Sequence, residues 1–181
     1  MKMADFYPYL VSSLPMLHFG MKPPFSFERF LEICREFIPA HDYIVLCNLP
    51  EPSRYPEDRS QQQTVRHWIE FDTTLRNELV KARSQRIHRE PSSYLRPRAA
   101  PDPTVAAAAT AAVANPSLLA AEMSLDEVRW KTLDELAAGH HFDLGLLITY
   151  ALKLLILIRW EPIHNADPGS ILEHTLQKAR G

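Results

Sequence analysis

The feature that most constrains the fold is a run of apolar residues near the C-terminus, from Leu144 to Ile158, interrupted by one charged residue, Lys153. Asp143 precedes the run and can cap a helix, because its carboxylate accepts hydrogen bonds from free backbone N–H groups at the positive end of the helix dipole. Pro162 follows and lacks the N–H that a continuing helix needs. These signals predict a helix that ends before Pro162.

This apolar run could be a membrane span or a core helix. Crossing the hydrocarbon layer needs about 20 predominantly apolar residues, whereas this run is shorter and contains a lysine. Its apolar residues also cover most of the helix circumference, which is typical of a helix that is buried on all sides. The sequence therefore predicts a central buried helix and no direct membrane span.

Composition excludes some classes of protein. The 181 residues are 46% hydrophobic and 23% charged, which suits a globular chain, and a formal net charge of −2 gives no general reason to bind nucleic acid. Two cysteines, Cys34 and Cys47, are too few for a disulfide framework or a four-ligand zinc site. No long apolar stretch precedes Tyr7, so we expect no secretory signal and a cytoplasmic location.

Helical periodicity dominates the rest of the chain. Cap signals and apolar spacing predict helices at 26–38, at 61–89 and from Asp167 onward. In the region before Gly139, Asn115-Pro116 fits a cap and first-turn proline, and Ser124 to Glu127 has capping-box spacing. The short apolar run 43–49 fits either a helix or a strand. We therefore expect an all-α helical bundle of five or six helices.

A break in composition separates two halves of the chain. Several prolines and an alanine tract at 106–114 predict a mobile or partly helical Pro/Ala-rich connector, 91–115, because the tract favours a helix but offers little to bury. The connector would join helical units 1–90 and 116–181 that pack as one domain. A weak echo between 71–91 and 142–162 is compatible with two similar helical units.

Signals for catalysis are weak. His140 and His141 with Asp143 contain metal-ligating side chains, but adjacent histidines diverge and no third ligand has a usable spacing, so a surface turn is the better interpretation. Ser12 and Ser13 near His18 lack a glycine-rich oxyanion loop. None of the five glycines stands in a phosphate-binding motif. We expect a non-enzyme without a metal or cofactor.

The strongest charge feature is a cluster of cations at the end of the 61–89 helix and in the segment after it. Its members are Lys81, Arg83, Arg86, Arg89, Arg96 and Arg98. One interpretation is docking on an acidic protein surface or a phosphate, with Tyr94 as a stacking ring. The other is a solvated helix end whose cations suit the negative end of the dipole.

Two segments carry a resemblance to a known family: YPYLVSSLPML at 7–17 and PPFSFERFL at 23–31, with shorter matches at 75–79, 130–136, 142–143 and 150–154. They resemble an uncharacterised bacterial family whose genes tend to sit among those for V-type ATPase subunits. The resemblance covers most of the chain outside the connector.

The resemblance implies a non-catalytic subunit or assembly factor of a rotary V-type ATPase, at the inner face of the cytoplasmic membrane. Its partners would be the central stalk and the membrane ring, which the protein would link in the manner of the socket protein of the central stalk in classical V-type enzymes. This chain is shorter than that socket protein, which has three similar helical units. The alternative is a nucleic-acid-binding or regulatory adaptor that uses 81–98, although the net charge argues against nucleic acid.

Overall fold

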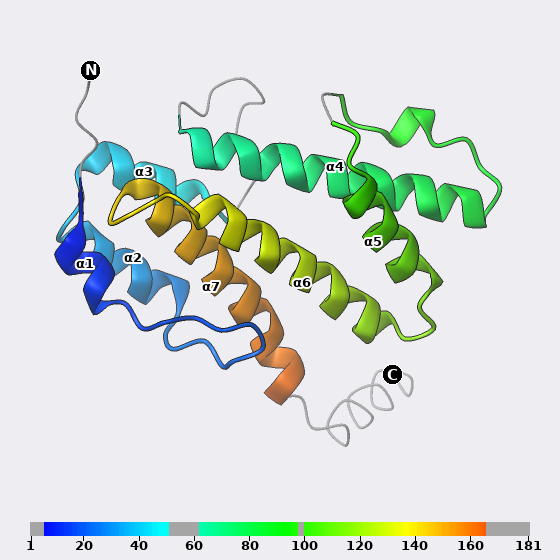
Figure 1. The fold of residues 1–181 in the computed structure, drawn as a ribbon. Helices are drawn as coiled ribbons and strands as arrows, with labels where there is room; N and C mark the ends of the chain where they lie inside the picture. The colour runs from blue at the N-terminus through cyan, green and yellow to red at the C-terminus, as the bar shows by residue number, and fades with distance from the viewer. Residues whose placement is uncertain (1–5, 51–61, 98–99, 166–181) are drawn as a thin grey trace, which may run out of the picture.

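The computed structural model describes residues 6–50, 62–97 and 100–165, in which helices joined by irregular segments are the regular secondary structure (Figure 1). The elements in chain order are α1 (Pro8–Ser13), α2 (Phe27–Arg35), α3 (Ala40–Asn48), α4 (Gln63–Arg86), the 3₁₀ turn η2 (Ser92–Tyr94), α5 (Pro103–Ala114), α6 (Leu118–Ala137) and α7 (Leu144–Asn165). The predicted all-α bundle is confirmed. The described residues hold seven α-helices, because the short α1 and the alanine-rich α5 add to those expected from the sequence.

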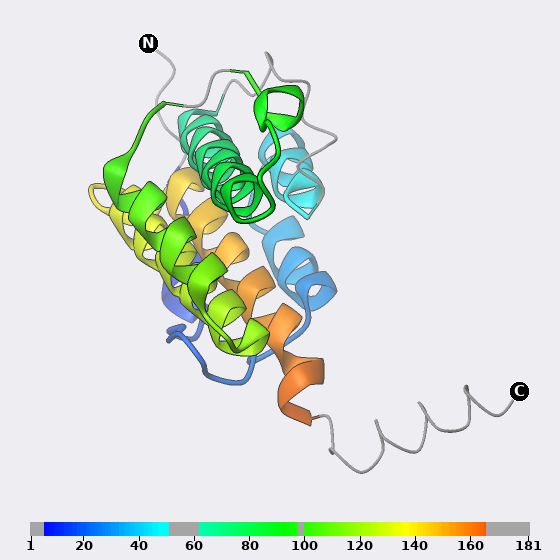
Figure 2. The same ribbon diagram turned by 90° about the vertical axis from the view of Figure 1, so that its right-hand side faces the viewer.

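Helix α7 lies at the centre of the bundle (Figures 1 and 2) and is in contact with α2, α3, α4 and α6. Leu147, Ile148, Ala151 and Leu154 in this helix are 0% exposed. The predicted central buried helix is therefore confirmed. Among the helices described, none is both long and apolar enough to cross a bilayer.

Local cap signals set several helix ends as predicted. The Asp143 Oδ1 atom accepts from the Leu146 N–H at 3.0 Å, and the Ser26 hydroxyl accepts from the Arg29 N–H at 3.2 Å. Gly139 follows α6 with a φ of 87°, a left-handed conformation that favours glycine. The run 43–49, which periodicity alone left open, belongs mainly to α3.

Two predicted helix ends are wrong. Helix α7 continues to Asn165 with Pro162 in its last turn; Pro162 is exposed, and its missing N–H removes only one backbone hydrogen bond, the one to the Ile158 carbonyl. Ser124 lies inside α6, where its hydroxyl donates to the Ala121 carbonyl at 2.8 Å. The helix starts at Leu118 because Ser117 caps it, accepting from the Ala120 N–H at 3.2 Å, whereas Asn115, the cap expected from the sequence, is the C-cap of α5. The closing helix expected from 167 onward lies outside the described residues.

The alanine tract forms a packed helix, α5, between α4 and α6. Val105, Ala109 and Ala112 are buried in a second apolar cluster that also includes Leu75 and Leu79 of α4 and Ala121 and Leu125 of α6. The expectation that this tract has little to bury is wrong, because small side chains allow the three helices to approach closely. The division into units 1–90 and 116–181, and their similarity, stay predictions.

The two cysteines should differ sharply in reactivity. Cys34 is buried in the main core whereas Cys47 is exposed, and burial, with a smaller contribution from Cys47, raises the pKa of the Cys34 thiol to about 12. Because the thiolate is the reactive form, we expect Ellman's reagent to modify Cys47 in the native protein and Cys34 only after unfolding in guanidinium. In a Cys47→Ser variant the native protein should be unreactive; rapid modification of that variant would contradict the burial of Cys34.

Candidate functional site

The cations that sequence analysis grouped together occupy the C-terminal end of α4 and the segment after it. The side chains of Arg83, Arg86, Arg89 and Arg96 are exposed. Lys81 is half-buried, and its ammonium lies 2.6 Å from Glu78 Oε1. Arg98 lies outside the described residues. Lys81 is therefore neutralised within its own helix, while four arginines face solvent.

In the folded protein these cations do not share one face. Each residue of a helix turns by about 100°, so Lys81 and Arg83 point to nearly opposite sides of α4. Arg96 is held elsewhere, because its backbone N–H donates to Asn77 Oδ1 at 2.9 Å and its carbonyl accepts from Asn77 Nδ2 at 2.8 Å. Arg83 and Arg86 share one side of the helix.

The chain turns back after α4 and keeps one more arginine close to this end of the helix. The Arg89 N–H donates to the Ser84 carbonyl at 3.0 Å. Ile87, which caps the helix, is 60% exposed. We call Arg83, Arg86, Ile87 and Arg89 the α4 basic end. This surface combines positive charge with an exposed apolar side chain.

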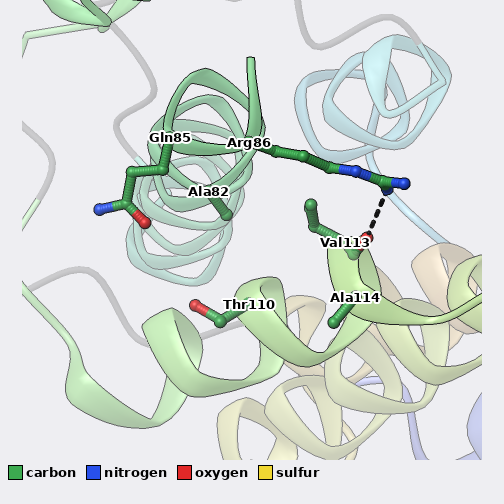
Figure 3. A pocket seen from close by; sticks show the side chains of 6 residues that line it. All are labelled: Ala82, Gln85, Arg86, Thr110, Val113 and Ala114. Carbon is green, nitrogen blue, oxygen red and sulfur yellow. Dashed lines mark hydrogen bonds between the residues drawn. The ribbon is translucent and has the colours of Figure 1, made fainter. Parts of the chain in front are cut away.

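A depression of about 510 Å³, open to solvent, lies between α4 and α5 next to the α4 basic end, and we call it the α4–α5 cavity (Figure 3). It is lined by Ala82, Gln85, Arg86, Thr110, Val113 and Ala114. Arg86 reaches from α4 toward α5, where its Nη1 donates to the Val113 carbonyl at 3.1 Å. Sequence reasoning missed this cavity, because one of its walls is the alanine tract that was expected to be a connector.

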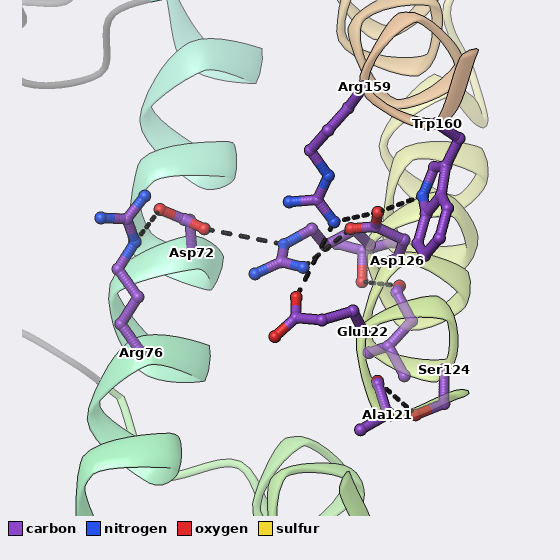
Figure 4. Close-up of polar contacts among 11 residues, drawn as sticks. Asp72, Arg76, Ala121, Glu122, Ser124, Asp126, Arg159 and Trp160 are labelled. Atoms are coloured by element: carbon purple, nitrogen blue, oxygen red, sulfur yellow. Dashed lines mark hydrogen bonds and ion pairs between the residues drawn. The ribbon is translucent and has the colours of Figure 1, made fainter. Parts of the chain in front are cut away.

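A buried charge cluster joins α4, α6 and α7 (Figure 4). At its centre Asp126 of α6 is 0% exposed. Its Oδ1 lies 2.8 Å from Arg129 Nη1, and its Oδ2 accepts from the Trp160 indole N–H at 2.7 Å and from the Arg159 guanidinium. Asp72 of α4 extends the cluster, with Oδ1 at 4.0 Å from Arg129 Nε.

The outer members of the cluster are ion pairs nearer the surface. Arg76 Nε lies 2.6 Å from Asp72 Oδ2, and Arg159 Nη2 lies 4.0 Å from Glu122 Oε2. Both oxygens of Asp126 are engaged and the residue is out of reach of solvent, so its carboxylate cannot serve as a general base. The cluster is a structural link between three helices.

A second polar group ties α4 to the turn between α6 and α7. His140 Nδ1 lies 2.7 Å from Asp143 Oδ2, and His140 Nε2 lies 3.4 Å from Thr64 Oγ1. This is the hydroxyl, imidazole and carboxylate order of a catalytic triad, but Thr64 is only 2% exposed and cannot meet a substrate. A Cβ on Gly145 would lie 2.5 Å from the His140 ring, so the ring packs on the first turn of α7.

The other candidates from the sequence are not brought together for chemistry. Ser13 donates its hydroxyl proton to the Leu10 carbonyl at 2.7 Å. Within 6–50, 62–97 and 100–165, no three histidine, cysteine, aspartate or glutamate side chains are placed to hold a metal ion. Of the features described, the α4 basic end and its cavity are therefore the best candidate for a binding site.

Comparison with known proteins found no matching family model, no similar curated protein and no similar solved structure. The family resemblance and the partners it implies stay predictions.

Proposed function

We propose that this protein is a non-catalytic subunit or assembly factor of a rotary V-type ATPase, and that it docks on an acidic partner through the α4 basic end. The observation that carries the docking proposal is the exposure of Arg83, Arg86 and Arg89 around the exposed side chain of Ile87. Glu90 is the acidic residue next to them in the chain. The choice of the rotary enzyme rests on the sequence resemblance.

The internal construction of the bundle suits a mechanical role. In a subunit that transmits force between a rotating stalk and a membrane ring, the helices must not slide past one another. Here the Asp126 cluster links α4, α6 and α7, and α5 packs between α4 and α6. These links support the finer proposal of a socket between the central stalk and the membrane ring.

Charge reversal at the docking surface provides the test. We expect Arg83→Glu with Arg89→Glu to slow association with the partner by about tenfold or more at low salt, because charged surfaces steer encounter. The measurement is retention of ATPase stalk and ring subunits by the tagged protein from gently solubilised membranes, followed by binding kinetics. Arg86 is left unchanged because it also holds α5 through Val113.

The matched control is Arg35→Glu with Arg66→Glu, which makes the same change in net charge at two exposed arginines of α2 and of the opposite end of α4. It should leave retention unchanged. Equal retention by Arg83→Glu with Arg89→Glu and by the wild type would refute docking through the α4 basic end. Recovery of neither stalk nor ring subunits by the wild type would refute the rotary-enzyme assignment, and steeply salt-dependent binding to nucleic acid would then favour the adaptor alternative.

A further inference from the structure

The cavity between α4 and α5 has an apolar interior and polar groups at its edge. Ala82, Val113 and Ala114 supply the apolar side chains, and Gln85 and Thr110 lie on facing helices beside them (Figure 3). The Thr110 hydroxyl donates to the Ala106 carbonyl at 2.9 Å, so its oxygen can still accept a hydrogen bond. An occupant with an apolar group and an N–H donor would match these walls.

Arg86 adds a preference for a carboxylate. A guanidinium has five N–H donors in a planar fork, and the hydrogen bond from Arg86 to the Val113 carbonyl uses one nitrogen at the edge of the cavity. The rest of the fork can bind a carboxylate in a bidentate manner. Because the bond to Val113 already orients the side chain, little further ordering is needed when an anion binds.

The surroundings favour a protein segment over a small molecule. The volume of about 510 Å³ falls within the range of small-molecule sites. However, Arg83, Ile87 and Arg89 extend the same combination of positive charge and apolar surface beyond the cavity. A small molecule would leave these side chains without a partner, whereas a peptide with several carboxylates would engage them together.

We infer that the α4–α5 cavity accepts one apolar side chain of an acidic partner segment, whose carboxylates pair with Arg86 and with the other arginines of the α4 basic end. The inference rests on the docking function proposed above and names the chemistry of the partner. The apolar anchor supplies affinity and specificity, and the arginines speed the encounter.

The test uses two labelled peptides of equal length and charge, one composed of glutamates and glycines and one in which a single leucine replaces the central glycine. We expect the second to bind the full-length protein about tenfold tighter in fluorescence polarisation, as burial of one large apolar side chain predicts. Thr110→Trp, which fills the cavity from an exposed helix position, should abolish this difference. Ala111→Trp, a change at another exposed position of α5 outside the cavity lining, should preserve it.

The outcomes distinguish binding in the cavity from binding by the charged surface alone. Equal affinity for the two peptides, or an unchanged difference in Thr110→Trp, would overturn the cavity inference. Docking by charge would still stand if Arg83→Glu with Arg89→Glu weakened both peptides. Binding of neither peptide by the wild type would overturn the inference and also count against the α4 basic end as a docking surface.

Discussion

Replacing Asp126 with asparagine is expected to lower the free energy of unfolding by about 3–5 kcal/mol, the typical effect of removing one partner from a buried ion pair. The carboxylate is fully buried and accepts hydrogen bonds from Arg129, Arg159 and Trp160. An amide of the same shape removes the negative charge that the two guanidiniums share, and leaves Arg129 and Arg159 with only the more distant carboxylates of Asp72 and Glu122, each at 4.0 Å. Guanidinium unfolding followed by circular dichroism would measure the change.

Glu127→Gln provides the matched control on the same helix. The Glu127 side chain is 53% exposed, and its Oε1 lies 3.3 Å from Lys131 Nζ, so the same chemical change removes a solvated ion pair. Its effect should stay below about 1 kcal/mol. If Asp126→Asn cost no more than this control, the buried cluster would not be a principal link between the helices.

Features that depend on local sequence were predictable. Ser26, Asp143 and Gly139 act through backbone groups within a few residues, so their positions relative to the apolar runs identify helix ends. The apolar circumference of α7 likewise predicted its burial. The fold class follows from such signals, because they recur along the whole chain and no comparable strand alternation competes with them.

Features that depend on distant partners were not predictable. Asp126 lies inside the segment with the capping-box pattern at Ser124, and nothing local indicated its main partners, Arg159 and Trp160, which are 33 and 34 residues away. The sequence of the alanine tract did not show that α4 and α6 would pack against it. Helix α7 continues past Pro162 because this residue is exposed and near the helix end, where the loss of one hydrogen bond costs little free energy. The local sequence pattern does not show this exposure.

The candidate site was predictable from the sequence only in part. The cations of the α4 basic end were visible in the sequence, as was their helical context. The sequence did not show that Lys81 is paired with Glu78 or that Asn77 holds Arg96 on another face. The cavity beneath Arg86 requires the contact between α4 and α5, which follows from tertiary packing alone.

Truncation of Phe30 to alanine is the other change with a large expected effect. Phe30 of α2 is 0% exposed, and its ring stacks on Tyr150 of α7 with centroids 5.6 Å apart. Tyr150 also donates its hydroxyl to the Pro15 carbonyl at 3.0 Å, so the same contact supports the segment before α2. We expect a loss of about 3–5 kcal/mol in the free energy of unfolding, because the cavity left in a close-packed core can collapse only partly.

Phe37→Ala is the control, since this ring is 42% exposed and its loss should cost less than about 1.5 kcal/mol. A second readout comes from Cys34, which is one helical turn after Phe30 and is also 0% exposed. If Phe30 anchors α2 on α7, Phe30→Ala should speed modification of Cys34 by Ellman's reagent while the rate at Cys47 stays unchanged. Loss of stability without faster modification would mean that α2 remains packed on α7 and that the Phe30 ring contributes stability without controlling access to the core.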